Sequence, residues 1–270
     1  MDAVPSDRRL REIASRFSEL EHVEAVTLAG SAALGTSDSH SDYDLYVYGR
    51  RPIDVAVRDG LLKPRAQRLE LHRTFWEDED AWIEPDDTEL EIMYRTCAWI
   101  EDELAARLDR CEASLGYTTA ICYSMEHSRA LWDRSGWFAR TQRRLLEGYP
   151  EGLARAVVQK NLPVLGAIIS SYEQQIQGAF LRQDIVSLNH RVAAWLSSYF
   201  DILFAANRQF HPGEKRLLVH AEKLPNAPES MLQDVRTICA AAGSLERCVA
   251  DHLVLVRRRL EVWLESKGVL

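Results

Sequence analysis

Residues 28–48 decide the fold expected for this chain, and they read LAGSAALGTSDSHSDYDLYVY. An apolar run enters a turn at Gly30-Ser31, a loop of small residues follows, and a second apolar run opens with Asp42-Tyr43-Asp44. Because the side chains of a strand alternate between its two faces, Asp42 and Asp44 are expected to point the same way. The stretch therefore predicts a strand, a turn, a loop and a second strand that begins with two neighbouring carboxylates.

Two carboxylates this close repel each other unless a cation lies between them. Carboxylate oxygens suit Mg²⁺, which commonly binds one or two carboxylates together with the phosphates of a substrate. Gly30 lets the backbone approach a phosphate, and free amides at the start of a following helix favour anions. The pattern predicts magnesium and phosphate binding at one place. The alternative for the acids alone is a surface turn followed by a strand with two solvated side chains.

This stretch resembles the nucleotidyltransferase signature of the DNA polymerase beta-like superfamily, in which a Gly-Ser or Gly-Gly pair precedes Asp-x-Asp between apolar residues. The resemblance implies that Asp42 and Asp44 hold Mg²⁺, with two ions expected. It also implies that Gly30 and Ser31 bind the β- and γ-phosphates of ATP or another nucleoside triphosphate. One ion would activate the attacking hydroxyl, and the other would stabilise the triphosphate.

The superfamily requires a third carboxylate on a neighbouring strand. Residues 88–94 alternate acidic and apolar side chains, as a half-buried strand does. Glu91, between Leu90 and Ile92, is the best candidate for a catalytic residue and metal ligand, although many relatives have Asp there. Glu89 lies on the same face and is its main rival. In the alternative interpretation both are solvated residues of an edge strand.

The net charge of −8 argues against an extended nucleic-acid surface, which is normally basic, and fits a small cationic partner. No run of about 18 apolar residues exists, so no membrane span is expected. The N-terminal residues lack the apolar segment of a secretory signal. The five cysteines lack the spacing typical of metal sites. We expect a cytoplasmic protein, and the sequence leaves a homodimer open.

The expected fold class is α+β, with a small mixed sheet followed by an all-helical bundle. We expect a nucleotidyltransferase catalytic domain over residues 1–110 and a helical bundle domain over residues 111–270. In the second domain, apolar residues recur at helical spacing at Leu188, Val192, Trp195, Tyr199 and Leu203. The expected strands are 23–28, 42–47, 69–75 and 89–94, the expected helices include 32–35 and 52–62, and the acidic residues 77–80 are expected to form a solvated turn.

A catalytic sheet followed by a helical domain resembles the kanamycin nucleotidyltransferase-like enzymes, and residues 207–216 resemble a segment of bacterial proteins with the same two domains. The resemblance implies that cations of the second domain contact the triphosphate. Lys215 and Arg216 are the nucleotide-binding candidates, and Lys160 is a weaker one. Each has the alternative role of an exposed charge on a helix surface. The acceptor is expected between the two domains, with residues 208–216 on its helical side.

The resulting hypothesis is an enzyme that moves a nucleoside monophosphate from a nucleoside triphosphate to a hydroxyl of a small-molecule acceptor. Two alternatives stay open: a protein-modifying nucleotidyltransferase, and a non-catalytic nucleotide-binding protein on the same fold. The presence of every required acid counts against the second alternative. Nucleic-acid polymerisation is disfavoured because the sequence has no basic stripe.

Overall fold

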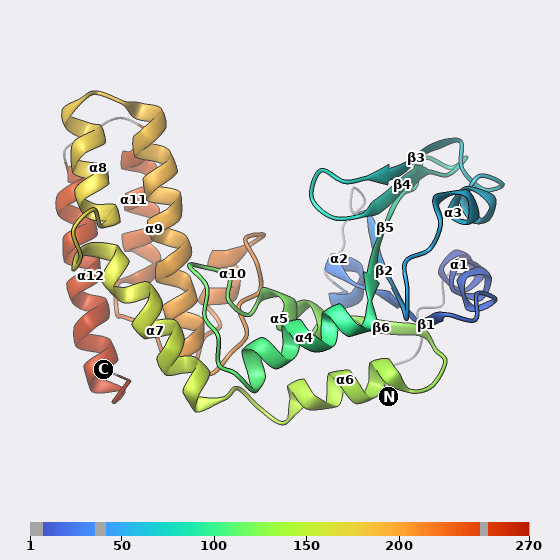
Figure 1. Ribbon diagram of the computed structural model, residues 1–270. Helices are drawn as coiled ribbons and strands as arrows, with labels where there is room; N and C mark the ends of the chain where they lie inside the picture. Colours follow the sequence, from blue (N-terminus) through green and yellow to red (C-terminus); the bar gives the residue numbers. More distant parts are fainter. Residues whose placement is uncertain (1–7, 36–41, 244–247, 270) are drawn as a thin grey trace. The chain divides into compact units, whose positions relative to one another are not determined.

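The computed structural model describes residues 8–35, 42–243 and 248–269. The chain forms two compact units (Figure 1). The first consists of Met1–Leu104 and Ser124–Glu147, and the second of Ala105–Tyr123 and Gly148–Leu270. No helix in the described ranges is long and apolar enough to cross a membrane.

The first unit is built on a six-stranded sheet with the strand order β3-β4-β5-β2-β1-β6. The parallel pairing of β2 with β5, beside antiparallel pairs elsewhere, makes the sheet mixed. In this pairing Asp44 lies opposite Glu91. The strands are β1 (Val23–Leu28), β2 (Tyr43–Gly49), β3 (Arg68–Arg73), β4 (Glu79–Ile83), β5 (Glu89–Thr96) and β6 (Arg129–Asp133).

Helices cover the two faces of this sheet. On one face Phe17 of α1 is fully buried in a core that includes Leu45 and Ile92. On the other face Tyr48 packs against Trp137 and Phe138 of α6, and its hydroxyl lies 3.2 Å from Met125 Sδ. The helices of this part of the chain are α1 (Arg8–Ser18), α2 (Gly30–Leu34), α3 (Val55–Leu62), α4 (Cys97–Leu108), α5 (Ala120–His127) and α6 (Trp137–Leu146).

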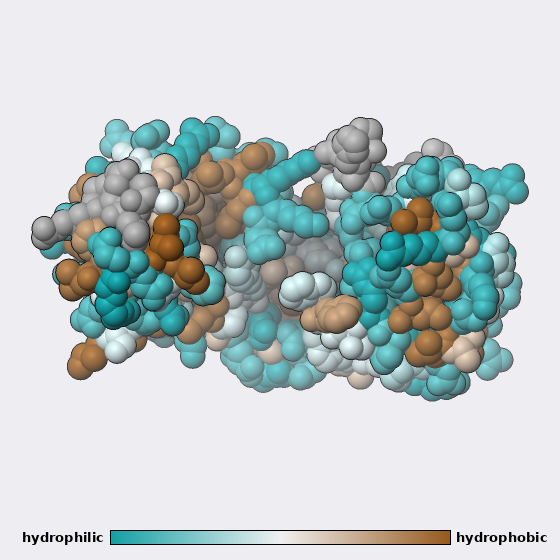
Figure 2. Space-filling model, turned by 90° about the horizontal axis from the view of Figure 1, so that it is seen from above, coloured by the Kyte–Doolittle hydropathy of each residue, from teal (hydrophilic) through white to brown (hydrophobic). Residues whose placement is uncertain are grey.

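The second unit is helical, and its long helices lie side by side in Figure 1. The residues predicted to form the stripe on α9, from Leu188 to Leu203, are all buried. The surface seen in Figure 2 is mostly hydrophilic, with smaller hydrophobic patches. The helices are α7 (Glu151–Gly166), α8 (Tyr172–Leu181), α9 (Ile185–Ala206), α10 (Leu217–Ala221), α11 (Met231–Ala242) and α12 (Cys248–Ser266).

A buried polar network ties the loop before α5 to this bundle. The Asp201 carboxylate of α9 accepts hydrogen bonds from Thr118 N at 3.1 Å, Thr118 Oγ1 at 2.6 Å and Asn161 Nδ2 at 3.3 Å. The Asn161 side chain in turn accepts from Gly116 N at 3.0 Å. Burial raises the pKa of Asp201 to about 6, although these hydrogen bonds oppose the rise.

The prediction of a solvated turn at residues 77–80 is wrong at its last two positions. Glu79 and Asp80 begin β4, and their exposed fractions are 5% and 0%. Asp80 accepts hydrogen bonds from the buried Arg58 at 3.3 Å and from the Tyr94 hydroxyl at 2.8 Å. This acidic segment can lie in the core because the Arg58 cation and the Tyr94 phenol, both distant in the sequence, compensate the buried carboxylate of Asp80.

Two further differences lie after residue 110, where the sequence predicts only helices. Strand β6 pairs with β1 at the edge of the sheet, and its five residues are too few for a distinct alternating pattern. Ile168, Tyr172, Ile176 and Phe180 recur every four residues, as in one helix, but Ile168 lies in the turn before α8 and is 45% exposed. Ser170 in the same turn has φ +61°, which an α-helix does not allow.

Candidate metal and nucleotide site

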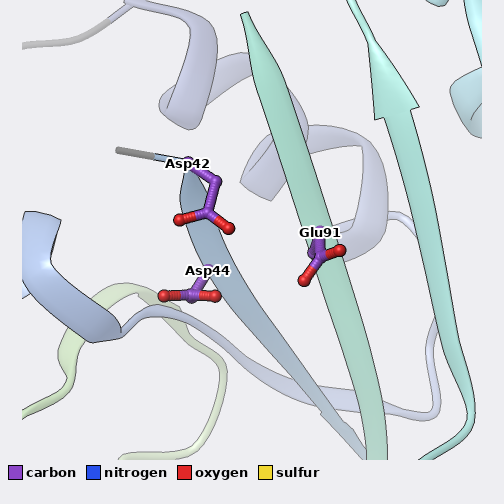
Figure 3. Close-up of side chains that lie close together, drawn as sticks. All are labelled: Asp42, Asp44 and Glu91. Atoms are coloured by element: carbon purple, nitrogen blue, oxygen red, sulfur yellow. The ribbon is translucent and has the colours of Figure 1, made fainter. Parts of the chain in front are cut away.

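Three carboxylates converge at one end of the central strands. Asp42 directly precedes β2, Asp44 is its second residue, and Glu91 lies opposite Asp44 on β5. One carboxylate oxygen from each residue lies within 4.8 Å of the others, and Figure 3 shows the three side chains facing a common point. All three residues are half-buried. The structure thus brings together the three acids that the sequence suggests as metal ligands.

This arrangement fits a hard divalent cation. Mg²⁺ binds oxygen ligands at about 2.0–2.1 Å in octahedral geometry, so two of its ligands lie at most about 4.2 Å apart. Oxygens within 4.8 Å of one another are close to that spacing. Among the described residues this is the one His, Cys, Asp and Glu cluster with a metal-compatible geometry.

Gly30 fixes the Gly30-Ser31 turn against this cluster. Its φ is +61°, and a Cβ atom built there would lie 1.9 Å from Asp44 Oδ2. Ala29 N also donates a 2.8 Å hydrogen bond to the Asp44 carbonyl oxygen. Only glycine satisfies both the left-handed backbone and the close approach of the carboxylate. The turn therefore places the backbone of Gly30-Ser31 directly beside the first two acids. Ser31 is half-buried at the start of α2, which begins at Gly30 and not at the predicted residue 32.

The pKa of Glu91 is raised, mainly because its carboxylate is partly buried. The nearby Glu79 and Asp42 carboxylates raise this pKa further, and the Arg73 guanidinium lowers it. Arg73 Nη2 lies 2.8 Å from Glu79 Oε1 and 3.4 Å from Glu91 Oε1. Arg73 thus holds Glu91 in place and offsets part of the repulsion among the acids.

Arg73 and Glu79 also border the site, and no local sequence pattern predicts this. Their positions depend on the β3–β4 hairpin, in which Arg73 pairs with Glu79, and residues 77–80 do not look like the start of a strand. Glu89, the rival of Glu91, is exposed at the beginning of β5 opposite Ile83 and is not part of the cluster.

The suggested cations belong to the second unit. Lys215, Arg216 and Lys160 are exposed there, with Lys160 on α7 and Arg216 immediately before α10. Their contact with a triphosphate stays a prediction.

The turn before Lys215 is held by a buried histidine. His211 N donates to Thr119 Oγ1 at 2.8 Å, and His211 Nδ1 accepts from Gly213 N at 3.1 Å. The rings of Tyr117 and Phe204 lie 5.0 and 5.1 Å from the imidazole, and burial lowers the pKa of His211 to about 4. His211 is therefore a neutral structural residue that anchors the segment.

In this mixed sheet a Gly-Ser turn adjoins an Asp-x-Asp strand, and a third acid lies on the neighbouring parallel strand. These features define the nucleotidyltransferase fold. Residues 10–110 match the family described as "Nucleotidyltransferase domain". Residues 10–110 therefore carry a nucleotidyltransferase domain of this superfamily. Residues 115–217 match a second family, "Domain of unknown function (DUF4037)".

Solved structures similar to this chain include a nucleotidyltransferase-like protein from Exiguobacterium sibiricum 255-15, with 11% identity and a TM-score of 0.44 over 94% of this chain and 72% of that one. A Thermotoga maritima CCA-adding enzyme complexed with tRNA has 11% identity and a TM-score of 0.33 over 97% of this chain and 82% of its own. No curated protein matches the sequence.

Proposed function

We propose that the protein transfers a nucleoside monophosphate from ATP or another nucleoside triphosphate to a hydroxyl of a small-molecule acceptor. The observation that supports this most is the convergence of Asp42, Asp44 and Glu91 beside the glycine turn at Gly30. A cluster of carboxylates that could hold Mg²⁺, beside a glycine turn, suits transfer at phosphorus, since its catalysis consists mainly of positioning and charge stabilisation.

Each residue of the cluster has a role in this proposal. Asp42, Asp44 and Glu91 would hold Mg²⁺, with two ions expected, and the amides of Gly30 and Ser31 would bind the β- and γ-phosphates. When bound, Mg²⁺ would supply charge stabilisation and a more acidic acceptor hydroxyl. The contact of Gly30 with Asp44 keeps the phosphate turn and the carboxylates in a fixed relation before substrate binds.

Lys215 and Arg216 are proposed to bind the triphosphate from the second unit. Both are exposed, and the buried His211 anchors the turn before them. Replacing both by alanine should raise the KM for the nucleotide and leave the melting temperature nearly unchanged. Arg236→Ala, which removes an exposed cation from α11, is the matched control and should change neither. An unaltered KM in the double variant would assign Lys215 and Arg216 to the scaffold.

The net charge of −8 supports a cationic acceptor and a protein without an extended nucleic-acid surface. A direct test is to incubate the purified protein with labelled ATP, Mg²⁺ and a pool of metabolites, and to search for a nucleotidylated product by mass spectrometry. Asp44→Asn protein should give no product. A label found on protein chains would favour the protein-modifying alternative, and tight Mg-ATP binding without any transfer would favour the non-catalytic one.

A further inference from the structure

A hollow lies on the sheet next to the carboxylate cluster. It has a volume of about 170 Å³ and is formed by β3, β4 and β5. In the register of the strands, Glu70, Ala81, Glu91 and Asp44 form one row across the sheet. The hollow exists because Ala81 places only a methyl group between the longer side chains of Glu70 and Glu91. Glu91 therefore belongs both to this hollow and to the cluster.

The position of the hollow relative to the phosphate turn is given by the order of the strands. Gly30 follows β1, on one side of the Asp44 strand, whereas the hollow lies over β5, β4 and β3 on the other side. A nucleotide whose phosphates contact Gly30 and Ser31 would leave this side of the cluster open. A molecule seated in the hollow would have its hydroxyl beside Glu91, where transfer takes place in the proposed function.

The charges that line the hollow favour a cation. Its two arginines are already engaged, because Arg68 pairs with Glu70 and Arg73 pairs with Glu79 and Glu91. Glu89 also lines the hollow, is exposed, and has no ion-pair partner among the described residues. Asp42 and Asp44 add negative potential from the far side of Glu91. The carboxylate oxygens of Glu89 are therefore available to bind a ligand.

We propose that this hollow is the acceptor subsite and that Glu89 binds an ammonium group of the acceptor. The proposal rests on the proposed function, and it assigns Glu89 a part in acceptor selection where the sequence suggested a rival metal ligand. Ligand pockets for drug-sized molecules have volumes of about 300–1,000 Å³, so a hollow of about 170 Å³ takes one ring or a short chain. The expected ligand is a small hydroxylated amine, or one such group of a larger molecule.

Glucosamine and glucose form a matched pair of probes, because they differ only in an ammonium group in place of a hydroxyl. Nuclear magnetic resonance titrations of labelled protein, at matched ionic strength and at a pH where the amine is protonated, would follow the amides of Ala81 and Leu90. Glucosamine should bind about fivefold more tightly than glucose, the upper range for an exposed ion pair. Glu89→Gln should abolish this preference. Glu21→Gln removes one negative charge just before β1, at the end of this strand away from Gly30. This variant should keep the preference for glucosamine.

Retention of the preference in Glu89→Gln, or its absence in the unmodified protein, would overturn the proposal. The proposed function is assessed separately in the same samples by Mg²⁺-dependent binding of ATP, which Glu89→Gln should leave unchanged. A preference that depends on Glu89, found together with no Mg²⁺-dependent binding of ATP, would leave an amine site in place and refute the nucleotidyl transfer.

Discussion

Replacing Gly30 by alanine should separate the Gly30-Ser31 turn, the proposed phosphate site, from the carboxylate cluster. The new Cβ would lie 1.9 Å from Asp44 Oδ2, and real Cβ contacts essentially never fall below 3.0 Å, so the carboxylate must move by at least 1.1 Å. Metal–ligand distances are held within about 0.2 Å, so this movement is about five times the tolerance. Affinity for Mg-ATP should fall by about 10–100-fold, the range seen when groups that orient metal ligands are altered.

Gly35→Ala is the control for backbone strain in this experiment. Gly35 has φ +67°, close to the +61° of Gly30, but a Cβ there would meet no atom within 4 Å. Both variants should lose about 1–2 kcal/mol of unfolding free energy, the cost of a left-handed conformation for alanine. Only Gly30→Ala should lose affinity for Mg-ATP, measured by calorimetry with and without Mg²⁺. Equal affinities in the two variants would refute the coupling of Gly30 to Asp44.

Two other predictions concern buried charges. Arg58→Met leaves the fully buried Asp80 without its cation, so the free energy of unfolding in urea should fall by about 3–5 kcal/mol; a loss below about 1 kcal/mol would contradict this role. Burial raises the pKa of Asp201 from 3.8 to about 6, so its stabilising contribution is present below the unfolded pKa and is lost as the pH rises through about 6. Relative to Asp201→Asn, the unmodified protein should lose about 3 kcal/mol of unfolding free energy between about pH 4 and pH 8. A difference in unfolding free energy between the two proteins that does not change with pH would contradict the raised pKa.

The parts of the fold that the sequence predicts well are those determined by local patterns. Strand β1 has the predicted bounds 23–28, because an apolar run there ends at a glycine turn. Helix α9 follows from a long stripe at regular spacing. Strand β4 was missed because its buried Asp80 depends on Arg58 and Tyr94, which are distant in the sequence. No local pattern of residues 77–80 reveals such partners.

The residues of the site also divide into those that a local sequence pattern predicts and those that it does not. The Gly30-Ser31 turn and the two aspartates are recognisable from residues 28–48 alone, because their spacing is local. The choice between Glu89 and Glu91 depends on the parallel register of β2 with β5, which places Glu91 opposite Asp44. Alternation within one strand leaves both glutamates on the same face and cannot decide between them. Arg73 and the hollow over Ala81 require the β3–β4 hairpin, which the sequence does not predict.

The most direct test of the central claim is the Mg²⁺ dependence of stabilisation by ATP in the unmodified protein and in Asp44→Asn. With ATP at about 100 times its Kd, Mg-ATP should stabilise the unmodified protein by about 2.7 kcal/mol, seen as a higher melting temperature, and ATP with a chelator should do so far less. Without ligand, Asp44→Asn should melt at the same temperature or slightly higher, because repulsion within the cluster is relieved. Mg-ATP should not stabilise this variant. Equal stabilisation of both proteins, or stabilisation of the unmodified protein that does not need Mg²⁺, would contradict a metal-dependent nucleotide site at Asp42, Asp44 and Glu91.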